Sequence, residues 1–250
     1  MRLRGPAPTA VLSREILIVL GLSLGMSAIN SVVSLVVKLT ATRALNQQTT
    51  SLNVPLSTRP FFDVLFQLLD IVFAVMPALL AIYLLNRSSP RPALGLDLRR
   101  WRSDVLWSIV LAGVIGVPGL LLYLGARELG LNTIVAAANL SGWWSGPVLV
   151  LSAAANGVLE EIVVVGYLLT RLRDVGWGVA AAVTFSAVLR GTYHLYQGFG
   201  AFLGNAIMGV VFAVFFLRTR RLWPLVLAHT LLDVVAFLGY TLLRDHVSWL

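Results

Sequence analysis

Two adjacent glutamates, Glu160 and Glu161, lie within an otherwise uncharged apolar stretch from Pro147 to Thr170. A stretch of this length is long enough to span a lipid bilayer. Each carboxylate near the centre of a span costs about 2.5 to 3.5 kcal/mol on insertion scales, so the pair opposes insertion unless neighbouring groups satisfy it. Acidic residues inside a membrane span are candidates for a functional site by default. The pair therefore predicts a site within the membrane.

Three polar residues in later apolar segments are candidate partners: His194, His229 and Asp233. His229 and Asp233 are four positions apart and so face the same way on a helix. Positioned carboxylates and imidazoles act as general acids and bases, so these groups together predict a water-activating centre on three successive membrane helices. The structural alternatives are an acid pair that only joins helices, an interfacial histidine and a local His-Asp hydrogen bond. Asn205 adds an amide to this centre, or else bonds across helices.

Helical geometry predicts how the two acids differ in direction. Asn156, Glu160, Val164 and Tyr167 lie along one stripe of a helix, and Glu161 points about 100° away from that stripe. The two carboxylates therefore need not share a role.

The composition is that of an integral membrane protein, since 58% of the 250 residues are hydrophobic, 12% are charged and the mean hydropathy is +0.86. The absence of cysteine excludes a disulfide framework, a thiolate metal site and a cysteine nucleophile. The net charge is +8, from one lysine and eighteen arginines against eleven acids. These cations lie between the apolar segments, so they indicate topology and not a nucleic-acid-binding surface.

The apolar segments predict an all-α, polytopic bundle of about seven transmembrane helices. We expect this bundle in a cell membrane, which is the inner or plasma membrane. The Arg- and Ala-rich composition suggests a bacterial host. The segments run at roughly 15–38, 62–86, 104–126, 147–171, 177–195, 199–217 and 222–243. We expect an N-terminal buttress of three spans over residues 1–146 and a four-span core over residues 147–250. The loop at 40–60 is predicted to be external, and residues 131–146, with Trp143 and Trp144, to be interfacial.

Basic residues favour an orientation with the N-terminus inside and the C-terminus outside. That orientation puts thirteen arginines inside and six basic residues outside. The inner set is Arg2, Arg4, Arg14, Arg87, Arg91, Arg99, Arg100, Arg102, Arg171, Arg173, Arg218, Arg220 and Arg221, and the outer set is Lys38, Arg43, Arg59, Arg127, Arg190 and Arg244.

The polar motifs resemble those of a known family over roughly residues 147–240. Glu160-Glu161 with Gly166, then His194, then His229 with Asp233 resemble the three signature motifs of the CPBP intramembrane endopeptidases, which include CAAX-prenyl-protease, bacteriocin-processing and abortive-infection types. Val165 stands where the first motif has arginine, and Arg190 stands where the second motif has phenylalanine.

The resemblance implies hydrolysis of a peptide bond in a membrane-associated protein or peptide, with the bilayer itself as a partner and no nucleic acid. It implies that Glu160 is the general base for a water shared with His194. His229 and Asp233 would stabilise the oxyanion or position the carbonyl, or Asp233 would orient His229. No cofactor is expected, although zinc held by Glu160, His194 and His229 is an open alternative.

Arg190 and Val165 lead to a specific expectation. Glu161 lacks the arginine that the family motif provides four residues later, so we expect Arg190 to pair with Glu161 across two helices and to fix His194 toward Glu160. The alternative is that Arg190 reaches the external headgroups. The site also requires a tilted, shortened or Gly191-broken fifth helix, because a straight one carries His194 away from His229.

Two functions compete with the endopeptidase. A catalytically lost immunity or binding protein on the same scaffold is favoured by Val165. A proton-coupled transporter could use the same buried acids and histidines as a relay, although the chain shows no internal repeat.

Overall fold

The computed structural model describes residues 9–87 and 94–247, which form nine α-helices and one two-stranded sheet. Arg2, Arg4 and Arg91, which contribute to the predicted orientation, lie outside the described residues. The helices are α1 (Thr9–Gly21), α2 (Leu24–Leu39), α3 (Pro60–Asn86), α4 (Trp101–Glu128), α5 (Ser145–Glu160), α6 (Leu168–Asp174), α7 (Val179–Thr192), α8 (Phe199–Thr219) and α9 (Trp223–Leu243).

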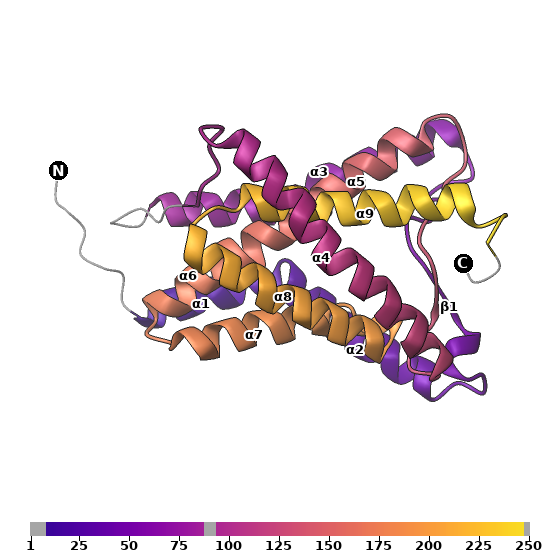
Figure 1. The fold of residues 1–250 in the computed structure, drawn as a ribbon, viewed down its shortest axis with the longest axis horizontal. Helices are drawn as coiled ribbons and strands as arrows, with labels where there is room; N and C mark the ends of the chain where they lie inside the picture. Colours follow the sequence, from indigo (N-terminus) through magenta and orange to yellow (C-terminus); the bar gives the residue numbers. More distant parts are fainter. Residues whose placement is uncertain (1–8, 88–93, 248–250) are drawn as a thin grey trace.

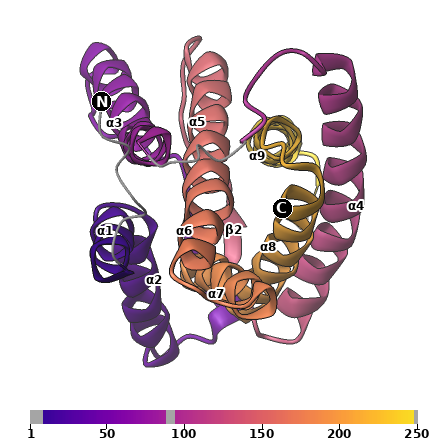
Figure 2. The same cartoon turned by 90° about the vertical axis from the view of Figure 1, so that its left-hand side faces the viewer.

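The central element of the bundle is one long span made of α5, a π-helical segment η2 (Glu161–Tyr167) and α6. Figure 2 shows this span between α1, α2 and α3 on one side and α4, α8 and α9 on the other. Every residue from Glu160 to Leu169 is buried. Because neighbouring helices enclose this span, its two acids face protein groups and not lipid.

The π-helical segment begins directly after Glu160 and is a feature that periodicity did not predict. It contains Ile162, Val163, Val164 and Val165, whose branched side chains are weaker helix formers than straight ones. The hydroxyl of Ser186 on α7 donates to the carbonyl of Val164 at 2.8 Å, so a neighbouring helix satisfies a backbone acceptor within the segment. Such π segments are rare and often lie at functional sites.

Helix α7 is short, as the predicted site requires. Its 14 residues rise only about 21 Å, which is less than the roughly 30 Å of a bilayer core. It ends at Thr192, and the 3₁₀ turn η3 (Leu195–Gln197) follows. Gly191 permits close contact with α8, since a Cβ there would lie 2.7 Å from the carbonyl oxygen of Phe202.

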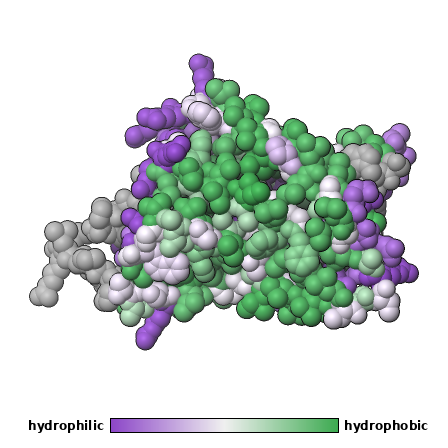
Figure 3. Space-filling model, turned by 60° about the horizontal axis from the view of Figure 1, so that its bottom comes forward, coloured by the Kyte–Doolittle hydropathy of each residue, from purple (hydrophilic) through white to green (hydrophobic). Residues whose placement is uncertain are grey.

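The prediction of an all-helical, multi-pass membrane bundle is confirmed. Within the described residues, α3, α4, the α5–α6 span, α8 and α9 are long and apolar enough to cross a membrane, and α1 with α2 would make a sixth span despite a bend of 54°. Apolar side chains cover much of the face seen in Figure 3, and hydrophilic ones gather toward its ends. The number of seven spans stays a prediction.

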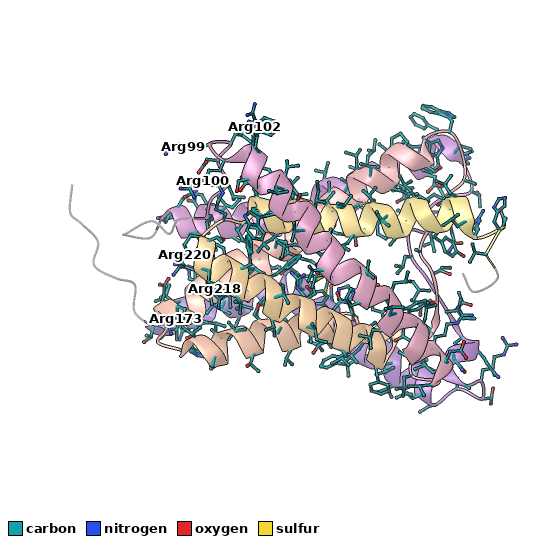
Figure 4. All side chains as sticks on the ribbon, in the orientation of Figure 1. Arg99, Arg100, Arg102, Arg173, Arg218 and Arg220 are labelled. Carbon is teal, nitrogen blue, oxygen red and sulfur yellow. The ribbon has the colours of Figure 1, made fainter. Side chains whose placement is uncertain are left out.

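The described arginines of the predicted inner side gather at one end of the bundle. Figure 4 shows this for Arg99, Arg100, Arg102, Arg173, Arg218 and Arg220, which come from the start of α4, the end of α6 and the end of α8. A shared end is what the positive-inside rule requires of them. The direction in which the bundle is inserted stays a prediction.

At the opposite end, two loops that the sequence placed outside pair with each other. Strand β1 (Thr49–Ser51) pairs in parallel with β2 (Ile134–Ala136), with Thr50 opposite Val135. The interfacial position predicted for Trp143 fits its exposed fraction of 92%, but Trp144 packs into a buried cluster with Val148 and Phe237. Trp144 is therefore a core residue, because it precedes α5 directly and faces α9.

The helices before residue 146 pack around the later ones. Helix α4 crosses α9 and α8 (Figure 1), α3 lies along α5, and α2 contacts the η3 turn. The division of the chain into a buttress and a core stays a prediction.

Candidate active site

Glu160, the last residue of α5, meets two side chains from the end of α7. The hydroxyl of Tyr193 donates to Glu160 Oε2 at 2.6 Å. His194 Nε2 lies 3.8 Å from the same oxygen, which is longer than a hydrogen bond. Glu160 and Tyr193 are both buried. The predicted proximity of Glu160 and His194 is therefore present, with Tyr193 as an additional contact.

Glu161 forms the ion pair that the sequence predicts. Arg190 Nη2 lies 2.6 Å from Glu161 Oε1, and both side chains are 0% exposed. The guanidinium carbon of Arg190 also lies 5.6 Å from the centre of the Phe212 ring, at a distance suited to a cation–π contact. The alternative in which Arg190 reaches external headgroups is wrong, because the guanidinium ends inside the bundle.

The same oxygen of Glu161 also orients His229. His229 Nδ1 lies 2.7 Å from Glu161 Oε1, whereas His229 Nε2 is 3.8 Å from Asp233 Oδ1. The expectation that Asp233 orients His229 is therefore wrong, because the partner within hydrogen-bond distance is Glu161. Glu161 is acceptor-only when ionised, so His229 carries its proton on Nδ1 in this contact and presents Nε2 to the site.

Asp233 has a different partner, Asn156 on α5, whose Nδ2 donates to Asp233 Oδ2 at 3.0 Å. The predicted stripe from Asn156 through Glu160 to Tyr167 is not one continuous surface. The Tyr167 hydroxyl donates at 3.0 Å to Glu15 on α1, which also pairs with Arg171. The π-helical segment between Glu160 and Tyr167 changes the number of residues per turn, and this explains the divergence.

Close packing of α5 and α9 brings Glu161 and His229 together. A Cβ on Gly157 would lie 2.7 Å from the hydroxyl oxygen of Thr230 and 2.9 Å from the carbonyl oxygen of Val226. A larger residue at position 157 would therefore push apart the helices that carry the two groups.

His194 lies at the start of a turn that other elements hold from outside. The backbone N–H of Tyr196 donates to Ser31 Oγ at 2.7 Å, and Lys38 Nζ donates to the carbonyl of Tyr196 and, at 2.6 Å, to Thr50 Oγ1. The two ring nitrogens of His194 are buried and have no hydrogen-bond partner in the part of the chain that the structure describes. A buried imidazole with both nitrogens available is able to bind a water or a substrate group.

Asn205 does not join the centre. Its Nδ2 donates to the carbonyl of Ala201 in α8 at 3.0 Å, and no described site residue hydrogen-bonds to it. An amide within a helix can satisfy itself on the preceding turn, and this local bond explains the difference from the prediction.

Three members of the site and its support were not predicted from the sequence: Tyr193, Ser31 and Lys38. Tyr193 had one available signal, since it directly precedes a candidate histidine at the end of an apolar segment. Ser31 and Lys38 lie more than 150 positions before the turn that they hold, and no local pattern connects them to it.

A cavity of about 260 Å³ adjoins this centre. It lies between α3, residues 53–56 and α5, and Asn156 is among its lining residues. Helix α3 contributes to its lining because α3 packs directly along α5.

The described residues do not fit the zinc alternative. No three of their His, Asp and Glu side chains form a group that could hold a metal ion. Metal independence itself stays a prediction.

The arrangement is suited to acid–base chemistry on a small polar substrate group. It combines one carboxylate with a tyrosine donor and a nearby imidazole, and a second imidazole that a separate carboxylate orients. An arginine neutralises that second carboxylate inside the bundle.

Comparison with known proteins agrees with the resemblance read from the motifs. Residues 142–235 match the family model described as type II CAAX prenyl endopeptidase Rce1-like. Searches of curated proteins and of solved structures gave no match.

Proposed function

Since residues 142–235 match the type II CAAX prenyl endopeptidase Rce1-like model, we propose that this chain is an intramembrane endopeptidase of the CPBP type, which hydrolyses peptide bonds of membrane-associated proteins or peptides with a water activated by Glu160 and His194. The observation that carries the proposal is the meeting of Tyr193 and His194 at one oxygen of Glu160 within a buried span. If the two acids only joined helices, the contacts of Glu161 would suffice, and the contacts of Glu160 with Tyr193 and His194 would have no role.

The proposed reaction begins at the side-chain carboxylate of Glu160. One water binds between Glu160 and His194, and Glu160 takes its proton as the oxygen attacks the carbonyl carbon of the substrate. The Tyr193 hydroxyl holds Glu160 Oε2, so the carboxylate keeps one direction. When the carbon–nitrogen bond breaks, Glu160 returns the proton to the leaving amine, and the products are a carboxylate and an amine.

His229 serves as the donor to the oxyanion in this scheme. Glu161 accepts from Nδ1–H, so donation from Nε2 to the developing negative charge requires the imidazolium form of His229, in which both ring nitrogens carry a proton. Arg190 pairs with Glu161, which in turn holds His229, and thereby acts as a positioning residue. Asp233, which Asn156 holds, places a carboxylate oxygen 3.8 Å from His229 Nε2.

The structure bears on both competing functions. Val165 replaces the motif arginine and so favours a catalytically lost protein. However, Arg190 on α7 supplies Glu161 with the cation that the motif lacks. Val165 is itself 0% exposed and packs in the main hydrophobic cluster. A transporter would need these groups to pass protons onward. Among the described residues, Glu161 is instead held in ion pairs with Arg190 and His229.

The test of the proposal is mass spectrometry of peptide fragments after incubation of the protein, in nanodiscs, with a library of apolar peptides. We expect wild type to produce new termini at defined positions and Glu160→Gln to produce none of them. Identical fragments from both proteins would contradict the proposal. Proton flux in proteoliposomes without cleavage would instead favour the transporter.

A further inference from the structure

A polar stripe runs along α3 on the side that faces α5. Asp63, Gln67, Asp70 and Ala74 recur at helical spacing, so they lie on one face of α3. Asp63 accepts the backbone N–H of Leu56 at 2.7 Å, and Gln67 Nε2 donates to the carbonyl of Val54 at 2.9 Å. These two bonds hold residues 54–56 against α3, where Val54 and Leu56 line the edge of the cavity. The first polar positions of the stripe therefore have structural partners.

Asp70 continues this stripe but differs from the residues before it. It is exposed, and no hydrogen bond or ion pair joins it to the described part of the chain. It lies ten residues into α3, which is about 15 Å along a helix that spans the bilayer. An ionisable residue at this depth is costly and is a functional-site candidate by default.

The cavity between α3 and α5 joins Asp70 to the active centre. Asp70, Gln67 and Ser152 line it, and so does Asn156, which donates to Asp233. Figure 2 shows α3 and α5 side by side along this region. Asp70 is the one acidic residue among the lining residues, and none of them is basic. The cavity therefore presents an acidic side chain with no basic partner among its lining residues, and Asn156 connects the cavity to the proposed site.

We propose that this cavity is a specificity subsite for a cationic group of the peptide substrate, with Asp70 as its counter-charge. The proposal rests on the proposed function, since it concerns the substrate of the same site. Asn156 lies one turn, about 6 Å, before Glu160, and an extended peptide rises about 3.3 Å per residue. That step corresponds to about two residues of extended peptide, so the basic residue is expected at least about two residues from the scissile bond.

A direct binding measurement tests the subsite without relying on turnover. Glu160→Gln protein is placed in nanodiscs of phosphatidylcholine and phosphatidylglycerol, which contain no primary amine. Fluorescence anisotropy then compares three apolar peptides that differ at one position, which is lysine, norleucine or glutamate. We expect the lysine peptide to bind roughly tenfold more tightly than the norleucine peptide, as a charge-assisted hydrogen bond allows.

Two substitutions of Asp70 in that background separate recognition from folding. Asp70→Asn should remove the preference for lysine and leave the affinity for norleucine unchanged, which also shows that the protein is folded. Asp70→Lys should reverse the preference toward the glutamate peptide. Glu128→Gln removes an exposed acid at the end of α4 and should change none of the three affinities.

Three results would overturn the subsite. The first is equal binding of the lysine and norleucine peptides, or no binding of either. The second is an equal loss of affinity for all peptides in Asp70→Asn. The third is displacement of the lysine peptide by phosphatidylethanolamine added to the nanodiscs, which would assign the cavity to a lipid amine. Selective binding with no cleavage by wild type would contradict the proposed function alone.

Discussion

Arg190 on α7 reaches Glu161 across the bundle at 2.6 Å, and neither side chain is exposed. The pair lies between the two halves of the proposed site, because Glu161 also holds His229 while Arg190 precedes His194 by one helical turn. Glu161 thus links Arg190 on α7 with His229 on α9.

The first prediction is energetic coupling between these two residues. Glu161→Gln and Arg190→Gln should each destabilise the protein by about 3 to 5 kcal/mol, because each leaves a buried charge without its partner. The double variant should lose less than the sum of the single losses, with a coupling of about 1 kcal/mol or more. Unfolding in mixed micelles measures the cycle, and strictly additive losses would contradict the pair.

The second prediction concerns the hydroxyl of Tyr193. Tyr193→Phe removes the donor to Glu160 Oε2, so the base loses its fixed direction while the aromatic ring stays. We expect kcat to fall by roughly tenfold or more with little change in KM. Tyr83→Phe, which removes an exposed hydroxyl bonded to Arg87, is the matched control. Equal effects of the two substitutions would refute a specific role for Tyr193.

The third prediction is that Ser31 positions His194 from another helix. Ser31→Ala removes the acceptor for the backbone N–H of Tyr196, so the turn that carries His194 loses one anchor. Turnover should fall by several-fold more than substrate binding, since a small displacement of a catalytic group is costly. Ser34→Ala, on the same helix and without a side-chain hydrogen bond to any described residue, should behave as wild type.

The fourth prediction compares two glycines. Gly157→Ala places a methyl group 2.7 Å from the Thr230 hydroxyl oxygen, and overpacking of this kind costs about 1 to 3 kcal/mol. Gly113→Ala, in α4, meets no atom within 4 Å and should be neutral or stabilising by up to about 1 kcal/mol. Thermal unfolding of both variants measures the difference. A Tm for Gly157→Ala equal to that of Gly113→Ala would show that the α5–α9 contact tolerates a methyl group.

The sequence predicted those features that depend on composition and on spacing within one motif. The helical bundle follows from the length of the apolar segments. The burial of the acid pair and the contact of Arg190 with Glu161 follow from the cost of an unpaired charge in a membrane. The predicted site also required a tilted, shortened or broken helix before His194, because a straight one would carry His194 too far from His229.

Other features depend on contacts between distant segments or on the local path of the backbone. The π-helical segment turned Tyr167 toward Glu15 and could not be predicted from a regular period of 3.6. The exchange of partners, in which Glu161 and not Asp233 holds His229, depends on how closely α5 and α9 pack at Gly157. The pairing of β1 with β2 joins loops more than 80 residues apart.

The proposed mechanism depends most directly on Glu160 as the base that activates water. The decisive measurement is the initial rate of ¹⁸O incorporation from labelled water into the new carboxyl terminus of a cleaved peptide, with Glu128→Gln as the control. Wild type and Glu128→Gln should incorporate label at the same rate, and Glu160→Gln should be slower by roughly two to four orders of magnitude. Incorporation by Glu160→Gln at the wild-type rate would contradict the account.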